Sequence, residues 1–319
     1  MKFIKYFVAV ASAVLLLASC GDDSRDYSNS NTEPSTAAGV EFSSSTATSY
    51  EVDPDDPTFQ LTVVRKATDA ASYDIKVVEN QDESFEVPSK VEFAQGETSK
   101  DITVKVKSSA TMGTALALTL TFNDADINPY TGGIKTLYAS CTVIKWESAG
   151  TGVWEGNIIN TFFNVNPMPM SVTLEKATTA SSVKYRFASP YTLCTAQDDE
   201  LGYYYGYPYA EETDVTENGG KFVITIDKNG ASLAPVNLGM NFGYGEISIG
   251  SVYGNVASAT LSSYPLGVYK QTETGGTVTF AAKSLYISMA EYEDGGKSPC
   301  SAGETVLYLS TDDYAASLK

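Results

Sequence analysis

The sequence predicts an all-β protein with two antiparallel β-sandwich-like domains, which follow a lipoprotein signal peptide and a flexible tether. Three observations predict this class. Apolar and polar residues alternate with period two in many short runs. Turn residues separate these runs every 8–12 residues, and no run of ten or more residues has a helical period. The 319 residues, 43% of them apolar, suit two β domains of roughly 100–170 residues.

Residues 1–19 are predicted to be the signal peptide. Lys2 and Lys5 precede an apolar segment, residues 7–18, which is shorter than the roughly 20 residues that span a bilayer. The segment ends in LASC at Cys20, which resembles the bacterial lipobox. That resemblance implies that Cys20 becomes the first mature residue and carries diacylglycerol, whose buried methylenes are worth about 0.8 kcal/mol each. The alternative is an ordinary secretory signal with an incidental cysteine.

Residues 20–38 are predicted to be a lipidated, disordered tether. They are rich in Ser, Asn, Asp and Thr and contain too few large apolar side chains to fold. Asp22, Asp23 and Asp26 directly after the cysteine resemble the export signal of Bacteroidota surface lipoproteins. The resemblance implies an outer-membrane protein that faces the cell exterior, anchored to the membrane through Cys20. The alternative is an acidic tether on a lipoprotein that faces the periplasm.

The first domain is predicted over residues 39–146. Its strands alternate apolar and polar side chains; residues 58–65, for example, place Phe59, Leu61 and Val63 on one face. Three turn segments separate them, at residues 53–57, 80–84 and 94–97. The predicted strands are residues 58–65, 100–107, 115–122 and 136–146.

Residues 59–107 resemble a Calx-beta-type domain in the passages "TVVR", "FEVPSKVEFAQGE" and "ITVKV". The resemblance covers about residues 39–145 and implies an immunoglobulin-like sandwich. Members of that family can bind calcium with acidic loops, but the spacing of the acids here matches no ligand set, so no metal site is predicted. We interpret the loop carboxylates as solvated turn residues; they are Asp53, Asp55, Asp56, Asp124 and Asp126.

The second domain is predicted over residues 147–319, after a boundary segment of small residues between two tryptophans at residues 145–156. Its Gly-x-Gly-x-Trp start and residues 184–191 resemble the carboxy-terminal module of uncharacterised Bacteroidota surface lipoproteins. No activity accompanies that resemblance, because β sandwiches host many functions. Its predicted strands are residues 170–177, 182–189, 221–227, 245–251, 276–283, 284–292 and 304–311.

Three cysteines lie beyond Cys20. Cys141 is in phase with the apolar residues of its predicted strand, which indicates a buried, inert thiol. Cys194 and Cys300 lie in loop-like parts of the second domain. Outside the cytoplasm they are able to form a disulfide, but the sequence does not place their Cα atoms within bonding range, so two separate thiols remain the alternative.

The tyrosine-rich segment, residues 197–212, is the most unusual stretch and the candidate ligand-binding site. Its aromatic residues are Tyr203, Tyr204, Tyr205, Tyr207 and Tyr209. A tyrosine ring can stack on a sugar while its hydroxyl forms a hydrogen bond, and tyrosine loses little entropy at interfaces. The segment therefore presents rings to a glycan or protein ligand, or it packs back on its own domain.

Composition excludes several function classes. The chain has no histidine, which excludes Ser-His-Asp and Cys-His catalysis and histidine zinc motifs. Its net charge of −18 disfavours nucleic-acid phosphate as a partner. The glycine-rich stretch 237–255 lacks the helix and lysine of a phosphate loop and is explained by tight turns and a bulged strand. No cofactor and no catalytic residue are predicted.

These observations favour a non-catalytic cell-surface lipoprotein that binds an extracellular ligand, with a glycan first. The alternative is an adhesin or structural surface protein that contacts other proteins. The third hypothesis is a carboxylate-dependent glycoside hydrolase, which requires two carboxylates about 5–10 Å apart. Glu246 is the sole acid within the glycine-rich stretch 237–255.

Overall fold

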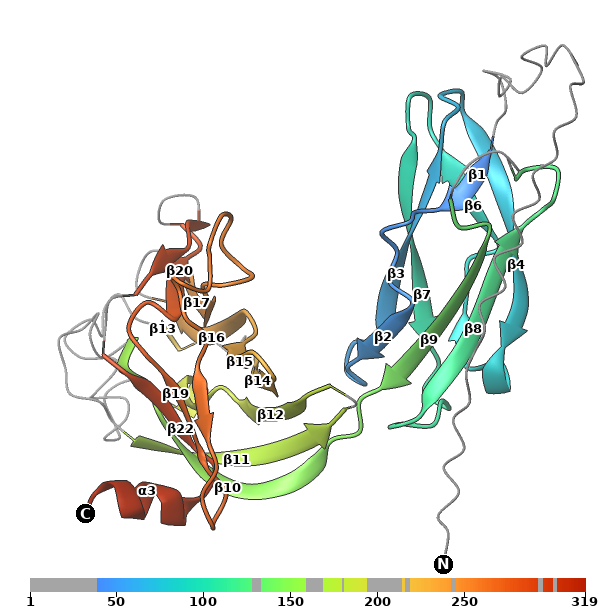
Figure 1. The fold of residues 1–319 in the computed structure, drawn as a ribbon. Helices are drawn as coiled ribbons and strands as arrows, with labels where there is room; N and C mark the ends of the chain where they lie inside the picture. The colour runs from blue at the N-terminus through green and yellow to red at the C-terminus, as the bar shows by residue number, and fades with distance from the viewer. Residues whose placement is uncertain are drawn as a thin grey trace, which may run out of the picture.

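The chain folds into two β domains that follow each other along the sequence (Figure 1). The structure is a computed structural model. It describes residues 39–127, 133–158, 169–179, 181–193, 214–215, 219–241, 245–291, 295–300 and 303–319. Each domain has a hydrophobic core of its own, and the predicted all-β class is confirmed. Within the described ranges, no helix is both long and apolar enough to cross a membrane.

The first domain is a sandwich of a four-stranded and a five-stranded sheet. The four-stranded sheet has the order β1–β3–β7–β5, and the other has the order β2–β9–β8–β4–β6. All pairs are antiparallel except β2 with β9, which run parallel. The bounds are β1 Val40–Phe42, β2 Ser49–Val52, β3 Thr58–Arg65, β4 Ala71–Asn80, η1 Gln81–Glu83, β5 Phe85–Glu86, β6 Lys90–Phe93, β7 Ser99–Val106, β8 Ala115–Phe122 and β9 Thr136–Val143.

The second domain combines an eight-stranded sheet, β15–β14–β12–β11–β10–β22–β19–β18, with a five-stranded sheet, β13–β16–β17–β20–β21. A terminal helix follows. The bounds are β10 Glu147–Glu155, β11 Pro169–Thr178, β12 Val183–Ala188, η2 Pro190–Leu193, β13 Asp214–Val215, β14 Lys221–Asp227, β15 Gly230–Leu233, β16 Val236–Asn241, β17 Glu246–Ser251, β18 Val268–Lys270, β19 Thr277–Phe280, β20 Leu285–Met289, β21 Ser298–Pro299, β22 Thr305–Tyr308 and α3 Thr311–Ser317.

The two edges of the eight-stranded sheet meet, so the sheet closes on itself. Ala231, in β15, and Gly267, just before β18, exchange two backbone hydrogen bonds of 2.8 and 2.7 Å. A Cβ at position 267 would lie 2.8 Å from the Phe280 ring, so the contact requires glycine. Closure pairs strand edges that would otherwise be open, and the sequence did not predict it.

The predicted boundary segment is largely a strand of the second domain. β10 pairs with β11 and β22, and its Trp154 is fully buried. A Cβ at Gly152 would lie 2.5 Å from the carbonyl oxygen of Tyr308, and Gly150 has a φ of +83° at a register shift. These glycines therefore permit close packing and a bulge within a strand, in a segment that the sequence analysis interpreted as a domain boundary.

Residues 304–311 were predicted as one strand, and that prediction is wrong at its end. β22 stops at Tyr308, and α3 begins at Thr311. The Ser310 hydroxyl caps the helix by accepting the backbone N–H of Asp313 at 3.0 Å. A seven-residue helix is too short for a helical period to show in the sequence.

The buried Asp313 carboxylate fixes α3 to the turn between β18 and β19. It accepts the hydroxyls of Thr272 at 2.5 Å, Thr274 at 2.7 Å and Ser310 at 2.7 Å, and the backbone N–H of Gly276 at 2.9 Å. Burial alone would raise its pKa, but these hydrogen bonds outweigh burial and lower the pKa to about 2.

We predict that Asp313→Asn lowers the free energy of unfolding at pH 7 by about 2 kcal/mol. Because the folded pKa lies below the unfolded one, the stabilisation is complete above about pH 4 and is lost as the pH falls toward 2. Urea unfolding at pH 7 and pH 3 measures it, with the exposed neighbour Asp312→Asn as control. Equal stability of the two variants at pH 7 would contradict the prediction.

Candidate functional site

Most residues that the sequence marked as sites lie outside the described ranges. They are Cys20, Tyr203, Tyr204, Tyr205, Tyr207, Tyr209 and Cys194. Lipidation, the tyrosine-rich binding segment and the disulfide therefore stay predictions. Cys300 is half-buried and packs against the core of the second domain. Peptide mapping under non-reducing conditions tests its pairing with Cys194.

The described residues on either side of the tyrosine-rich segment belong to the second domain. Before it, Tyr191 in η2 is buried, and its hydroxyl accepts the indole N–H of Trp154 at 3.1 Å. After it, β13 pairs with β16 at Met240 and Asn241. In the first domain, Cys141 is buried, and burial raises the pKa of its thiol to about 11, as the predicted inert thiol requires.

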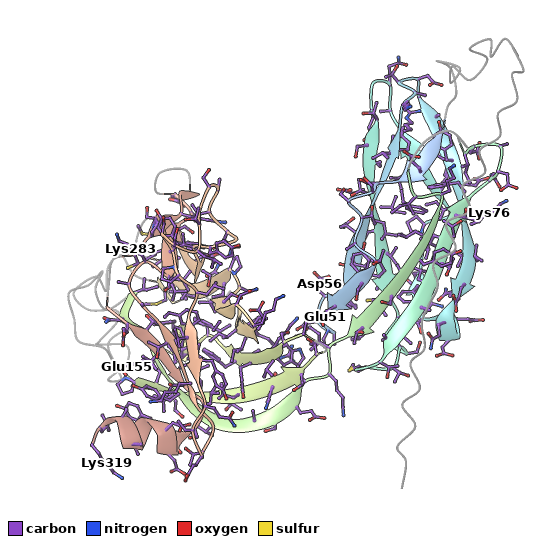
Figure 2. The ribbon with its side chains drawn as sticks, viewed as in Figure 1. Glu51, Asp56, Lys76, Glu155, Lys283 and Lys319 are labelled. Carbon is purple, nitrogen blue, oxygen red and sulfur yellow. The ribbon has the colours of Figure 1, made fainter. Side chains whose placement is uncertain are left out.

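Among the described residues, the densest set of charged contacts lies where the two domains meet, and Arg186 of β12 is at its centre. The Arg186 guanidinium donates through Nη1 to both carboxylate oxygens of Asp53, at 3.1 Å each, and to Asp55 at 3.3 Å. Its Nε donates to Glu175 of β11 at 2.6 Å. Asp53 and Asp55 come from the turn after β2, at the end of the first domain where Figure 2 labels Glu51 and Asp56.

An aromatic ring and two lysines complete these contacts. The Trp146 indole N–H donates to Asp53 at 2.9 Å, and the Arg186 guanidinium lies 4.4 Å from the centroid of the Trp146 ring. Lys184 pairs with Glu51 at 2.9 Å, and Lys221 pairs with Asp55. We call this set the joint cluster: Glu51, Asp53, Asp55, Trp146, Glu175, Lys184, Arg186 and Lys221.

The joint cluster changes the interpretation of the first domain's acidic turn. Asp53 and Asp55 were interpreted as solvated turn residues, but their carboxylates also pair with cations of the second domain, although the Asp55 side chain remains 60% exposed. The hydrogen bond from Lys221 and the charges of Lys221 and Arg186 lower the pKa of Asp55, although burial opposes this. An acid catalyst in a glycosidase needs a raised pKa, so the lowered pKa of Asp55 does not suit that role. Within the described ranges, no three acidic, cysteine or histidine residues are grouped to hold a metal ion.

A groove of about 520 Å³ runs over the seam where the eight-stranded sheet closes. We call it the seam groove. Leu261 and Val268 in its wall have 43% and 65% of their surface exposed, and Tyr269 anchors its hydroxyl to the carbonyl of Gly275 at 3.2 Å. The turn between β14 and β15 supplies its polar side. The groove is lined by Ile226, Asp227, Lys228, Asn229, Gly230, Leu261, Pro265, Leu266, Gly267, Val268 and Tyr269.

Sequence reasoning missed both features. The joint cluster joins residues more than 130 positions apart, such as Asp53 and Arg186, and no local pattern reveals such a pair. The seam groove depends on the closure between Ala231 and Gly267, which is equally non-local. One signal was available: the turn Asp227–Gly230 follows a clear strand and is rich in polar residues.

No protein-family model matches the chain, and no curated protein matches it. Among solved structures, it is similar to a Bacteroides ovatus protein of unknown function, with 11% identity and a TM-score of 0.27 over 85% of this chain and 92% of that one. A second Bacteroides ovatus match is a multidomain protein including DUF1735, with 10% identity and a TM-score of 0.26 over 84% and 92%. A third is the calcium binding domain CBD12 of CALX1.1, with 14% identity and a TM-score of 0.25 over 51% and 83%. At these scores the matches assign the chain to no family and give it no activity.

We predict that Arg186→Met loosens the contact between the domains. It leaves the carboxylates of Asp53, Asp55 and Glu175 facing one another without their shared cation. Losing these charged hydrogen bonds weakens the contact between the domains by about 2 kcal/mol. This free energy is smaller than for fully buried pairs, because the carboxylates are partly exposed. Small-angle X-ray scattering should show a broader distribution of distances within the molecule.

Two comparisons sharpen this measurement. Lys228→Met removes an exposed charge away from the joint cluster and should leave scattering and stability unchanged. Arg186→Lys keeps the charge but loses the guanidinium fork, so it should fall between wild type and Arg186→Met. A scattering curve of Arg186→Met identical to that of wild type would show that the joint cluster does not hold the domains together.

Proposed function

We propose that this protein is a non-catalytic lipoprotein of the cell surface that binds an extracellular glycan with its second domain. The seam groove is the observation that carries the proposal. It combines an apolar wall and the half-buried Tyr269 with the polar groups of Asp227 and Asn229. Sugars present both apolar faces and hydroxyls, so a site with one apolar side and a few short polar side chains suits them.

The rest of the chain supports this role by attaching the second domain to the membrane and positioning it. The predicted lipid on Cys20 attaches the protein to the outer membrane, and the predicted tether, residues 20–38, provides reach. The first domain stands between tether and binding domain. The joint cluster then fixes the direction in which the seam groove points.

A non-catalytic role is supported by the electrostatics of the acidic groups that the structure brings together. The carboxylates of the joint cluster are paired with Arg186, Lys184 and Lys221. Glu246 of β17 accepts the side-chain amide of Asn237 at 2.5 Å. The Asp55 carboxyl, for example, has a lowered pKa because of Lys221 and Arg186, whereas an acid catalyst near neutral pH requires a raised one.

A second candidate function, contact with other proteins as an adhesin, is favoured by exposed side chains on two strands of the first domain's five-stranded sheet. Tyr138 in β9 and Val78 in β4 have 71% and 64% of their surface exposed, and Val77 is also exposed. Tyr138 lies opposite Thr119 of β8, which lies opposite Glu79 of β4, so these three side chains share one face of the sheet. Val77 lies opposite Leu120 instead, and the register shifts between Val77 and Glu79. Exposed aromatic and apolar groups of this kind are enriched at protein interfaces.

We predict that the intact chain without its signal peptide binds a subset of a glycan array, and that Asn229→Ala and Tyr269→Ala each weaken binding roughly fivefold to tenfold. Tyr269→Phe should keep binding because it keeps the ring. Tyr253→Ala removes an exposed tyrosine outside the groove and serves as control. Replacing Tyr203, Tyr205 and Tyr207 with Ala in parallel tests the tyrosine-rich segment. Wild-type binding that only this triple variant abolishes would move the site out of the seam groove.

We predict that antibodies to the folded domains label intact cells, and that Cys20→Ala abolishes both this labelling and incorporation of radiolabelled palmitate. Removal of the acyl chains removes the anchoring energy. Labelling that appears only after permeabilisation would place the protein on the periplasmic side. Asp22→Asn combined with Asp23→Asn and Asp26→Asn keeps the lipid and tests the acidic export signal alone.

A further inference from the structure

A second hollow, of about 380 Å³, lies in the first domain beside the acidic turn after β2. We call it the lysine hollow. Its floor is formed by Val106 and Val143, which are buried, and its walls by Pro54, Pro57 and Met112. The volume falls within the range of small-molecule sites. The remaining lining residues are polar or small: Glu86, Lys105, Lys107, Ser108, Ser109 and Ala110.

Basic residues are scarce in this chain, and the lysine hollow has two. The sequence contains 21 basic and 39 acidic residues. Within the described ranges, Lys90, Lys100, Lys145, Lys184 and Lys221 each form an ion pair with a carboxylate. Lys105 and Lys107 form none there, as is also the case for other lysines such as Lys76 and Lys228. Glu86 lies opposite Lys105 in the pairing of β5 with β7, which leaves the lining with one net positive charge.

Met112 gives the lysine hollow an exposed apolar side chain that a ligand can cover. Its side chain is exposed although it lies beside buried Val143, in a turn that Gly113 ties to the strand end by donating to the Val143 carbonyl at 2.8 Å. Met adapts its shape to varied apolar partners. A ligand with an apolar body would cover Met112, Pro54 and Pro57 at once.

We propose that the lysine hollow binds a small amphipathic anion: an apolar chain or ring that carries a carboxylate. The apolar body occupies the space between the prolines and Met112. The carboxylate lies toward Lys105 and Lys107, and the hydroxyls of Ser108 and Ser109 are available as further donors. This site is separate from the seam groove, and its failure leaves the glycan proposal untouched.

Titration with octanoate tests the site in the intact chain without its signal peptide. The chain has six methionines, of which Met1 lies in the predicted signal peptide. Methyl-labelled methionine therefore gives a simple two-dimensional NMR spectrum, in which Met112→Leu assigns the Met112 signal. Octanoate should shift that signal with saturation below about 10 mM. The buried Met170, Met240 and Met289 of the second domain should not shift.

The charge requirement is tested by the ligand and by variants. Octylamine should give no saturable shift of the Met112 signal, and 1-octanol should bind more weakly than octanoate. Lys107→Met should weaken octanoate roughly threefold, and the double variant with Lys105→Met should bring octanoate down to the level of octanol. Lys76→Met, an exposed lysine of β4 that does not line the hollow, is the matched control.

Three results would overturn the proposal. The first is no saturable shift of Met112 with octanoate. The second is equal affinity for octanoate and octanol in wild type. The third is unchanged octanoate affinity in the double lysine variant, measured at low salt where an ionic contribution is largest.

Discussion

The arrangement of the two domains depends on a single buried charge. Arg186 keeps only 6% of its surface exposed, and a guanidinium removed from water is costly unless carboxylates and hydrogen bonds surround it. Glu175 supplies one partner within the second domain, while Asp53 and Asp55 supply the others from the first. Within the second domain alone, the charge of the Arg186 guanidinium is therefore only partly balanced. Contact with the first domain supplies the remaining carboxylates.

The same residue ties the joint to the core of the second domain. β12 lies inside the eight-stranded sheet, where Arg186 lies opposite Glu175 of β11 and Val223 of β14. Its neighbours Tyr185 and Phe187 belong to the hydrophobic core, and Phe187 stacks on Phe222 with ring centroids 4.8 Å apart. A shift of β12 that displaced Arg186 would also displace these rings. Since interiors are close-packed, the position of the joint cluster is as well defined as the core beneath it.

The sequence predicts the strands whose apolar and polar residues alternate most clearly. It does not predict very short elements or contacts between residues that are far apart in the chain. The predicted bounds of β3, β8 and β14 agree with the structure, because alternate apolar side chains face the core over seven or eight residues in each strand. Strands of two or three residues, such as β1 and β13, are too short for alternation to be detected. α3 did leave a trace, since Ser310 followed by Asp313 has the spacing of a helix cap. The joint cluster and the closed seam left none, because their partners are remote in sequence.

The two proposed sites depend differently on the joint. The lysine hollow lies in the first domain and draws Pro54 and Pro57 from the turn that also holds Asp53 and Asp55. The seam groove lies in the second domain, which the Arg186 contacts join to the first domain. A flexible tether raises the range of positions that a surface protein samples, whereas a fixed joint keeps the groove's orientation relative to the first domain constant. In the proposed function, reach therefore comes from residues 20–38, and presentation of the groove comes from the joint cluster.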